Sequence, residues 1–458
     1  MTSDVVIVGG GIAGLSCAYE LQKRGVAFTL LEAGTRPGGV IFSERVDGFT
    51  VDAGPDSLLI QKPEGIELCR ELGLGDRLVS TKLPRGAYVQ RGGELHPLPA
   101  ASVLGIPTRL APFLSSRLFS WPGKLRMAGE LFIPPKRDRG DESIAGFIER
   151  RFGREAVTYL AEPLLAGIHA GDVDRLSIGA LFPRFVESER KYGSLLKAFR
   201  RTRPAGQSAE GVFKSLPGGL SELIAALVAA LPPGSIRLRA PVARISAGSG
   251  SGRFRVEASA QLPIEARSVV LATPAFVTAT VVSDLDAELA ERCAAIPYTS
   301  IATVALAFER DAVAHPLEGS GFVVPHAERS PILAASWLSS KWPNRAPEGR
   351  VLLRAFIGGA RDPEALQQSD EELASRSLTA LTPLLGIRGA PLLTRIYRWP
   401  RANAQHEVGH LDRVADIDRI LARHPGLFVT GSAFRGVGIP DCIADGRATG
   451  RAIADSRT

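Results

Sequence analysis

The feature that most constrains this chain is a glycine-rich turn between an apolar segment and a helix-compatible segment near the N-terminus. Residues 5–8 are four consecutive apolar residues, which is typical of a buried strand. Gly9, Gly11 and Gly14 follow with G-x-G-x-x-G spacing, and residues 15–23 suit a helix. In such a unit the glycines permit a tight turn, close approach of the backbone to a pyrophosphate, and close packing of helix on strand. The segment predicts the first unit of a dinucleotide-binding domain.

An acidic residue at the end of the next apolar segment narrows the choice of ligand. Residues 27–31 suit a second strand, and Glu32 follows them directly. A carboxylate at this point can accept hydrogen bonds from the ribose hydroxyls of an adenosine, while the helix N-terminus favours the phosphates. Because Glu32 disfavours a 2′-phosphate, the residues indicate FAD or NAD rather than NADP. A plain glycine-rich surface turn is the alternative.

Length and composition indicate a globular protein of several domains. The chain has 458 residues, too many for one ordinary core, and 45% of them are hydrophobic. The four cysteines lie far apart without a C-x-x-C pair, which argues against a disulfide framework or a zinc cluster and suits a reducing compartment. We find no signal peptide and no apolar stretch of membrane-spanning length. We therefore expect a cytoplasmic protein.

Positive charge is concentrated in one part of the chain. The net charge is +7, and residues 85–203 hold 20 Lys and Arg against 12 Asp and Glu. A solvated face, a site for an anionic substrate and a patch for acidic lipid headgroups would each explain this excess. Residues 112–122 combine Phe and Trp with Arg117, which suits either a core helix or peripheral contact with a membrane surface. Nucleic acid is disfavoured, because no recognition motif accompanies the charge.

Two further glycine-containing loops follow the dinucleotide motif. Residues 36–40 read Arg-Pro-Gly-Gly-Val, in which the paired glycines permit close approach to a ligand and Arg36 can reach a phosphate. Gly54-Pro55, followed by Asp56-Ser57, forms a rigid turn of the kind that lies beside a planar ring. Both loops favour a ligand with a ring system as well as phosphates.

These segments together resemble the flavin amine oxidase superfamily. The run G-V-G-I-P-D-C-I at residues 436–443 is similar to the oxygen-dependent protoporphyrinogen and coproporphyrinogen oxidases within it. The resemblance implies an α/β fold: a glutathione-reductase-like Rossmann FAD domain, an α/β substrate domain and a helical domain. It implies that FAD, not NAD, is the cofactor. Noncovalent attachment is expected, because Cys442 is not placed like the flavin-linked cysteine of monoamine oxidases.

The resemblance also implies which residues contact FAD, and they come from both ends of the chain. They are Gly9, Gly11, Ile12, Ala13, Gly14, Glu32, Ala33, Arg36, Gly39, Val40, Gly54, Pro55, Asp56, Ser57, Val242, Trp399, Gly431, Val437, Gly438 and Ile439.

Four residues are implied on the substrate side. Arg85 would pair with a substrate propionate, with an ordinary surface charge as the alternative. The backbone carbonyl of Gly167 would lie near the reacting carbon. Ile301 and Phe356 would line a macrocycle pocket, with core packing as the alternative. No catalytic side chain and no metal is implied, since the flavin carries the chemistry.

The activity implied by the resemblance is the oxidation of protoporphyrinogen IX to protoporphyrin IX in haem biosynthesis. Dioxygen would accept six electrons and form hydrogen peroxide. The alternative is oxidation of coproporphyrinogen III to coproporphyrin III by the same fold. More distant alternatives are another flavin amine oxidase or desaturase, an NAD-binding dehydrogenase and a non-catalytic flavoprotein. The oligomeric state, whether monomer or dimer, is left open.

Three domains are expected on the same basis. Residues 1–84, 204–284 and 396–458 would form a discontinuous FAD-binding domain, with residues 200–208 as a linker back into it. Residues 85–203 would form the helical, basic domain with its candidate membrane surface. Residues 285–395 would form the substrate-binding domain.

A metalloprotease-like pattern, H-E-x-x-H, occurs at residues 406–410. We expect it to be a chance match, because Gly409 weakens a helix there and no third ligand stands at the required spacing. Residues 399–410 instead resemble a porphyrinogen oxidase segment in which Pro-Gln-Tyr precedes Gly-His. Here Ala404-Gln405-His406 replaces Pro-Gln-Tyr, which leaves the role of that aromatic residue open.

Overall fold

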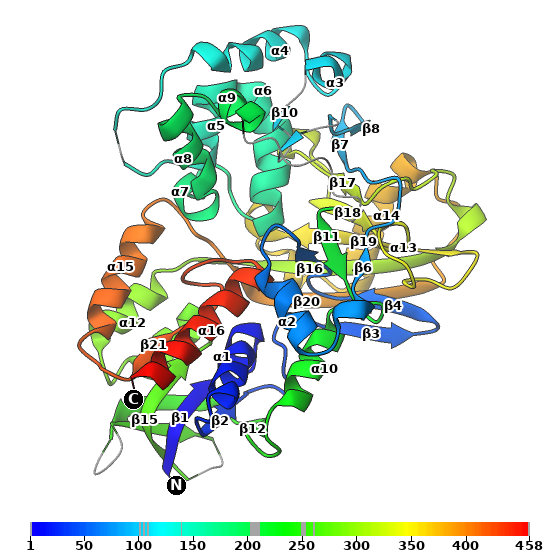
Figure 1. Ribbon diagram of the computed structural model, residues 1–458. Helices are drawn as coiled ribbons and strands as arrows, with labels where there is room; N and C mark the ends of the chain where they lie inside the picture. The colour runs from blue at the N-terminus through cyan, green and yellow to red at the C-terminus, as the bar shows by residue number, and fades with distance from the viewer. Residues whose placement is uncertain are drawn as a thin grey trace.

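The chain is arranged in three layers, which Figure 1 shows from top to bottom. The computed structural model describes residues 2–99, 102–103, 106–107, 110–138, 140–201, 211–248, 253–259 and 262–456. Helices form the upper layer, a broad sheet forms the middle layer, and a second sheet with both chain termini forms the lower layer. Within these described ranges, no helix combines the length and apolar character needed to cross a membrane.

The lower sheet contains the two strands predicted around the glycine-rich turn. Its order is β12-β2-β1-β15-β14-β13, with β21 paired to β15. Strands β12, β2, β1, β15 and β21 run parallel, whereas β14 and β13 are antiparallel additions. The strands are β1 (Thr2–Val8), β2 (Phe28–Leu31), β12 (Ile236–Arg237), β13 (Val242–Ala247), β14 (Phe254–Ala258), β15 (Ile264–Leu271) and β21 (Leu427–Val429).

Both faces of this sheet are buried, which explains why the apolar run of β1 does not alternate with polar residues. Val5 and Ile7 face a core with α1 (Ile12–Lys23), α2 (Glu64–Glu71), α10 (Ser221–Ala230) and α16 (Ile439–Asp455). Val6 and Val8 face a core with α11 (Ala275–Val282), α12 (Ala287–Ala294) and α15 (His410–Leu421). The predicted helix after the glycine turn is therefore confirmed as α1.

Helix α16 packs directly on α1, which brings the two ends of the chain together (Figure 1). The contact depends on small residues: a Cβ at Gly446 would lie 2.2 Å from the carbonyl oxygen of Ala13, and one at Gly450 would lie 3.0 Å from that of Cys17. Because neither position has room for a side chain, the two backbones approach closely.

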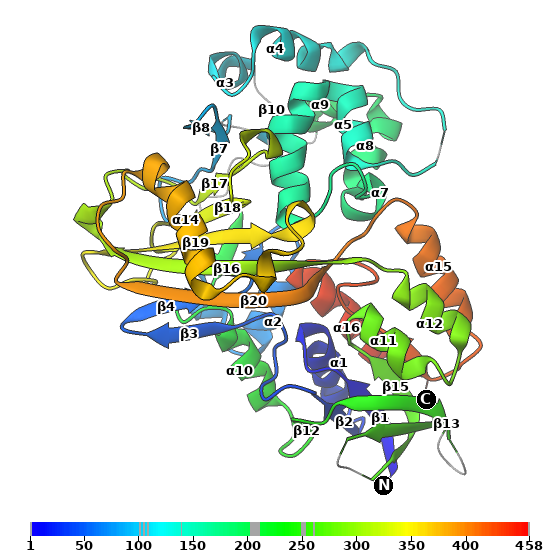
Figure 2. The same cartoon turned by 180° about the vertical axis from the view of Figure 1, so that it is seen from behind.

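The middle sheet has the order β20-β16-β19-β18-β17-β7-β8. The two strands predicted to be central, at residues 301–306 and 351–357, are confirmed as parts of β16 and β19. Helix α14 (Asp370–Leu385) covers one face, as Figure 2 shows, and the hairpin β3–β4 packs on the other. The strands are β7 (Tyr88–Arg91), β8 (Glu94–Pro97), β16 (Tyr298–Glu309), β17 (Gly321–Val323), β18 (Ala334–Trp337), β19 (Arg350–Gly358) and β20 (Leu393–Ala404).

Shorter elements join the two sheets. The hairpin comprises β3 (Ser43–Val46) and β4 (Phe49–Asp52), and a three-stranded sheet comprises β5 (Leu58–Leu59), β11 (Phe213–Ser215) and β6 (Val79–Ser80). A two-stranded ladder comprises β9 (Ser102–Val103) and β10 (Ile106–Pro107), and helix α13 (Leu338–Lys341) follows β18.

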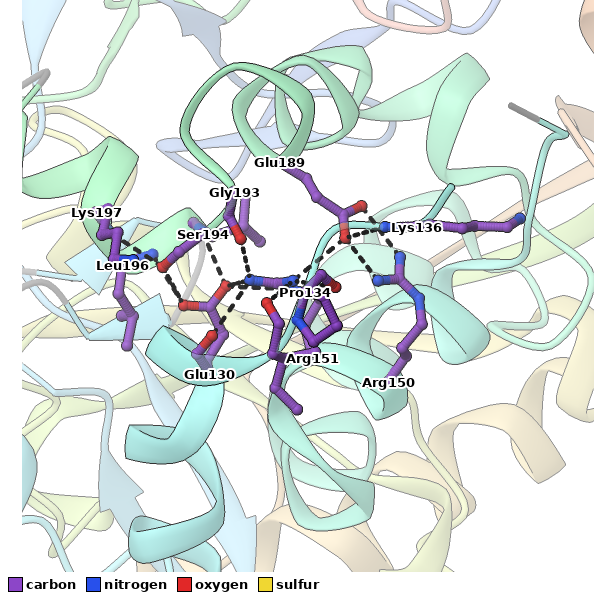
Figure 3. Close-up of polar contacts among 12 residues, drawn as sticks. Glu130, Pro134, Lys136, Arg150, Arg151, Glu189, Gly193, Ser194, Leu196 and Lys197 are labelled. Atoms are coloured by element: carbon purple, nitrogen blue, oxygen red, sulfur yellow. Dashed lines mark hydrogen bonds and ion pairs between the residues drawn. The ribbon is translucent and has the colours of Figure 1, made fainter. Parts of the chain in front are cut away.

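The upper layer is held by a buried ion cluster, which Figure 3 shows. Arg151 and Glu130 are fully buried, and Arg151 Nε lies 2.9 Å from Glu130 Oε1. Glu130 accepts hydrogen bonds from Ser194 Oγ and from the backbone N–H of Leu195.

The helices of the upper layer are α3 (Leu110–Ser115), α4 (Trp121–Ala128), α5 (Ile144–Phe152), α6 (Arg154–Ala156), a π-helix (Val157–Ala166), a 3-10 turn (Gly167–His169), α7 (Ile178–Leu181), α8 (Pro183–Tyr192) and α9 (Leu195–Arg201).

Large apolar side chains are exposed on this layer. Trp121, Leu125 and Phe132 are 65%, 72% and 88% exposed, and the ammonium group of Lys124 lies 4.6 Å from the centre of the Trp121 ring. Contact with a membrane surface stays a prediction for this region.

The expected domain boundaries can be compared with the strands. β20 runs unbroken across position 395, and β7 and β8 join the middle sheet through β17 rather than the helical layer. The three-domain division stays a proposal, and we would place its boundaries outside these strands. Of the predicted linker at residues 200–208, Arg200 and Arg201 instead form the end of α9, and residues 202–208 lie outside the described residues.

Candidate active site

The predicted pyrophosphate-binding turn is formed at the N-terminus of α1. Gly9 has φ +106°, and its N–H donates to Leu31 O at 2.8 Å, which sets the tight turn after β1. A Cβ at Gly14 would lie 2.0 Å from Gly9 O, so α1 can pack on the turn only through glycine. A Cβ at Gly11 would meet nothing within 4 Å. Gly11 thus borders open space, and the first amides of α1, from Ile12 and Ala13, have no carbonyl partner within the helix, so an anion would be favoured there.

Glu32 lies at the end of β2, as predicted, and its carboxylate is fixed by backbone amides. Oε2 accepts from Gly10 N at 2.7 Å and Oε1 accepts from Gly34 N at 2.6 Å. Ala33, which lies between Glu32 and Gly34 in the chain, is exposed. Ala240 N donates to Glu32 O, which brings the segment leading to Val242 alongside the end of β2. The carboxylate and Val242 therefore border the same end of the sheet.

The loop at residues 36–41 packs against the glycine turn. Gly38 N donates to Gly10 O at 2.7 Å, and a Cβ at Gly39 would lie 3.4 Å from Gly11 Cα. Arg36 donates to the carbonyls of Pro37, Gly39 and Ile41, so its guanidinium shapes the loop, and a phosphate contact stays a prediction.

The predicted rigid turn lies beside the same loop. A Cβ at Gly54 would lie 1.9 Å from Val40 O, which places Gly54 and Pro55 against Val40. The middle sheet anchors this turn: Trp399 Nε1 and Thr303 Oγ1 both donate to Ala53 O, at 3.0 and 2.8 Å. The turn is thereby wedged between the lower and middle layers.

Asp56 uses its side chain in a buried ion network rather than leaving it free. Lys341 Nζ lies 2.9 Å from Asp56 Oδ1, and Arg354 Nη2 lies 3.2 Å from Oδ2. Burial alone would raise the pKa of Asp56, but the charges of Lys341 and Arg354 outweigh it and hold that pKa well below its usual range. Ser57 Oγ donates to Asp56 as well. We infer that Asp56 and Ser57 hold the turn in place, while direct contact with FAD stays a prediction for both.

Two of the predicted substrate-side residues, Ile301 and Phe356, lie on the face of the middle sheet that meets the rigid turn. Ile301 and Thr303 share a face of β16, and Phe356 pairs with Thr303 in the neighbouring strand β19. Trp399 pairs with Ile301 from the other side. The guanidinium of Arg354 lies 4.8 Å from the centre of the Phe356 ring. Ile301, Phe356 and Trp399 are therefore neighbours on the face that meets Ala53.

The C-terminal segment completes the site next to α1. A Cβ at Gly431 would come within 3.8 Å of Ala13 Cβ, and Gly431 N donates to Asp445. Val437 precedes Gly438, the N-cap of α16, and Ile439 packs in the core with α1. Gly438 N donates to Asp441, which also binds Lys62 Nζ at 2.6 Å. Gly431 thus lies beside the start of α1, while Val437, Gly438 and Ile439 lie at the start of α16, the helix that packs on α1.

Gly167 begins a 3-10 turn that ends at His169, at the lower end of the helical layer. Gln405 Nε2 donates to His169 O at 3.0 Å, which ties this turn to the end of β20. Burial, with smaller contributions from His406 and Lys62, lowers the pKa of His169 to about 4, so this ring is neutral near pH 7.

Arg85 follows a segment that contacts the anchor of Asp56, because Lys82 N donates to Lys341 O. It is exposed in the loop before β7, and its Nε donates to Thr81 Oγ1 at 2.9 Å. Its pairing with a propionate stays a prediction.

Several residues that fix the site were missed from the sequence. Lys341, Arg354 and Lys62 each pair with a carboxylate next to a glycine turn. The partners of Lys341 and Arg354 lie about 290 positions away along the chain, so no local pattern indicates them. The only available signal was that Asp52 and Asp56, in an otherwise apolar stretch, would need a cation when buried.

A dinucleotide with an attached ring system fits these residues. The open space at Gly11 and the amides of α1 suit a pyrophosphate, and the fixed carboxylate of Glu32 suits a ribose. The turn at Gly54-Pro55 and the segment 431–439 flank the same region from two sides. Fold and site together define a dinucleotide-dependent oxidoreductase with a Rossmann-type domain.

Comparisons with known proteins specify the family. The family model for flavin containing amine oxidoreductases matches residues 12–454. A coproporphyrinogen III oxidase of Bacillus subtilis is 37% identical over 99% of this chain and 98% of its own length. A chloroplastic protoporphyrinogen oxidase of Nicotiana tabacum is 29% identical over 96% of this chain and 83% of its own length. A crystal structure from Exiguobacterium sp. 255-15, of a proposed protoporphyrinogen oxidase, has a TM-score of 0.88 at 34% identity and covers 100% of this chain and 99% of that chain.

The chain belongs to the flavin containing amine oxidoreductases, within the branch of the porphyrinogen oxidases. The predicted fold class and the predicted cofactor, FAD, are thereby confirmed, and the NAD-binding dehydrogenase is set aside.

Proposed function

We propose that this protein is an FAD-dependent oxidase that converts coproporphyrinogen III to coproporphyrin III. The observation that carries the proposal is the 37% identity to a coproporphyrinogen III oxidase over nearly the full length of both chains. A second protein of that name, from Staphylococcus aureus, is 34% identical over 98% of both. The first expectation from the sequence was protoporphyrinogen IX, and the comparisons favour its alternative instead. The protoporphyrinogen oxidase of Nicotiana tabacum is more distant.

Charge supports the same choice of substrate. Coproporphyrinogen III has four propionates, whereas protoporphyrinogen IX has two. Residues 85–203 hold 20 Lys and Arg against 12 Asp and Glu, an excess that attracts the more anionic substrate over longer range. Arg85 is the residue that we propose to pair with one propionate.

The chain's own residues would orient the macrocycle and exclude water. When bound, FAD supplies the acceptor for two-electron oxidation of a carbon–carbon or carbon–nitrogen system. We assign the flat apolar surface to Ile301 and Phe356, because they lie side by side on the sheet face that meets the rigid turn. Gly167 would approach the macrocycle from the helical layer through its backbone.

The number of electrons and protons released supports dioxygen as the co-substrate that we propose. Removing six hydrogen atoms from the porphyrinogen releases six electrons and six protons, which three molecules of dioxygen can take up as three of hydrogen peroxide. In this proposal each two-electron oxidation therefore consumes one dioxygen.

The test compares the two porphyrinogens directly. We expect the purified protein with FAD to produce fluorescent porphyrin in air from coproporphyrinogen III at a kcat/KM at least about tenfold higher than from protoporphyrinogen IX, a difference of roughly 1.4 kcal/mol in transition-state binding. Arg85→Ala should raise KM and leave the FAD content unchanged. Equal or reversed rates would assign the protein to protoporphyrinogen IX, and an unchanged KM would remove Arg85 from the site.

A further inference from the structure

The H-E-x-x-H segment at residues 406–410 does not have the geometry of a metal site. Gly409, with φ +84°, is the N-cap of α15, so His406 and His410 do not share a helix turn. Their rings instead stack face to face, with centroids 3.8 Å apart and planes 11° from parallel. Both side chains are buried. A stacked pair of buried imidazoles requires a different explanation.

Each ring is hydrogen-bonded to the turn between β21 and α16, which contains the predicted flavin contacts Gly431, Val437 and Gly438. His406 Nε2 lies 2.9 Å from Ser432 O, and His410 Nε2 lies 3.1 Å from Phe434 O. Carbonyl oxygens only accept, so both Nε2 atoms must carry the hydrogen. If both rings are neutral, both Nδ1 atoms are then unprotonated. His410 Nδ1 is buried without a partner among the described residues, so a proton added there would find no acceptor.

The same segment is tied to the substrate side. Ser177 N donates to His406 O at 2.8 Å, and Val408 N donates to Arg175 O at 2.9 Å. Gln405 Nε2 donates to His169 O, next to the turn that begins at Gly167. Residues 405–410 therefore connect the helical layer to the turn between β21 and α16.

We propose that His406 and His410 are positioning residues of the flavin site. As a stacked neutral pair they hold the carbonyls of Ser432 and Phe434, and thereby fix the turn that carries Gly431 and Gly438. Protonation of either ring replaces the neutral stack with a buried charge and loosens this turn. FAD binding then weakens in acid.

The surroundings of the pair favour the neutral form at pH 7. Burial, then the charge of His406, lowers the pKa of His410 to about 3, and Arg413 on α15 acts in the same direction. Burial also lowers the pKa of His406, opposed by its bond to Ser432 and by Asp441 on α16. His169 faces His406 from the helical layer and Lys62 faces His169 from the loop after β5.

The sign of the pH effect follows from these pKa values. A released histidine titrates near 6.5, whereas the held histidines titrate lower. The held state is therefore favoured fully above pH 6.5 and loses stability as the pH falls toward the lowered values. For His410, whose pKa is about 3 in the held state, the loss at pH 5.5 amounts to about tenfold in the binding constant when the ring regains its ordinary pKa on release; the effect of His406 has the same sign.

The experiment measures FAD released from the holoprotein between pH 8 and pH 5, by ultrafiltration and fluorescence of free flavin, without porphyrinogen. The readout depends on FAD binding alone, so it is independent of the proposed substrate. His406→Gln keeps an N–H donor close to the Nε2 position but cannot titrate. We expect it to hold FAD like the wild type at pH 7.5 and to lose measurably less FAD than the wild type at pH 5.5. His406→Phe keeps the stacking ring without the donor and should bind FAD more weakly at every pH.

His315→Gln is the matched control. His315 is a partly buried histidine with a lowered pKa that packs against Tyr88 and Trp337 in the middle sheet, so its variant should follow the wild-type curve. The proposal is overturned if His406→Gln releases FAD with the same pH dependence as the wild type, or if His406→Phe retains wild-type affinity at pH 7.5. Should His406→Phe fail to fold, the comparison of His406→Gln with the wild type decides alone.

Discussion

At the scale of single residues, the site depends on where a side chain is missing. Gly11 and Gly14 are three positions apart on the same turn, yet their surroundings differ completely. A Cβ at Gly14 would lie 2.0 Å from Gly9 O, whereas a Cβ at Gly11 would meet nothing within 4 Å. Gly14 is needed to build the turn, and Gly11 is needed to leave its outer side open.

This difference predicts opposite results for two substitutions. Gly11→Ala should leave the fold and the melting temperature of the apoprotein unchanged but weaken FAD binding by tenfold or more, roughly, because the methyl group occupies the space in front of the α1 amides. Gly14→Ala should lower the melting temperature of the apoprotein itself. Circular dichroism gives the melting temperatures and flavin absorbance per protein gives the cofactor content. Full flavin content in Gly11→Ala would contradict the assignment of this space to the pyrophosphate.

At the scale of elements, buried ion pairs connect segments that are distant in sequence. The cluster in Figure 3 joins the turn after α4 to α5, α8 and α9, because Arg151 also donates to Ile133 O and Gly193 O. Glu189 contacts both Arg150 and Arg151. The helical layer therefore depends on a few charges, of which Arg151 and Glu130 have no exposure to water.

Removing one of these charges should be costly. Arg151→Met leaves the buried Glu130 carboxylate without its cation, and we expect a loss of about 3–5 kcal/mol in the free energy of unfolding. Arg154→Met, three residues along the same chain segment, breaks an exposed pair with Glu149 and should cost less than about 1 kcal/mol. Urea unfolding of both variants gives the comparison. Equal losses would mean that burial of the Arg151 pair contributes nothing.

Some helices and strands could be predicted from the sequence, whereas contacts between distant segments could not. Apolar periodicity and glycine spacing were sufficient for β1, α1 and β2, and for the central strands β16 and β19, because those signals are local. The parallel pairing of β7 with β17 joins segments more than 200 residues apart, which no local pattern specifies. Asp56 was predicted as a cofactor contact, but its partners Lys341 and Arg354 were missed, because they too are far from it in the sequence. In the sequence His406 stands where the resembling segment has a tyrosine, and only the fold shows that it stacks on His410.

At the scale of the whole molecule, the lower layer is closed by the contact between α1 and α16. Gly446 and Gly450 let the helices meet, and the same two helices present Gly11 and Gly438 at their N-terminal ends. A change in the distance between the helices therefore alters stability and cofactor binding together.

Gly446→Ala should test this link. Its Cβ would lie 2.2 Å from Ala13 O, and overpacking of this kind costs about 1–3 kcal/mol. We expect a lower melting temperature and weaker FAD binding in one variant, with added FAD restoring part of the melting temperature by mass action. Ala448→Ser, at an exposed position of the same helix, should change neither quantity. A variant that loses stability but keeps full FAD affinity would show that the two helices act independently.

The pairing of the first and last long helices also affects how the protein is made. β1 and α1 leave the ribosome more than 400 residues before their partner α16, which consists of residues 439–455. A growing chain therefore exposes the apolar flank of α1 until α16 has been made, and during that time it lacks the residues of α16 that we expect beside FAD. We therefore expect FAD to bind only after α16 has been made, so a shortage of flavin in the cell would act on chains that already contain both helices rather than on shorter nascent chains.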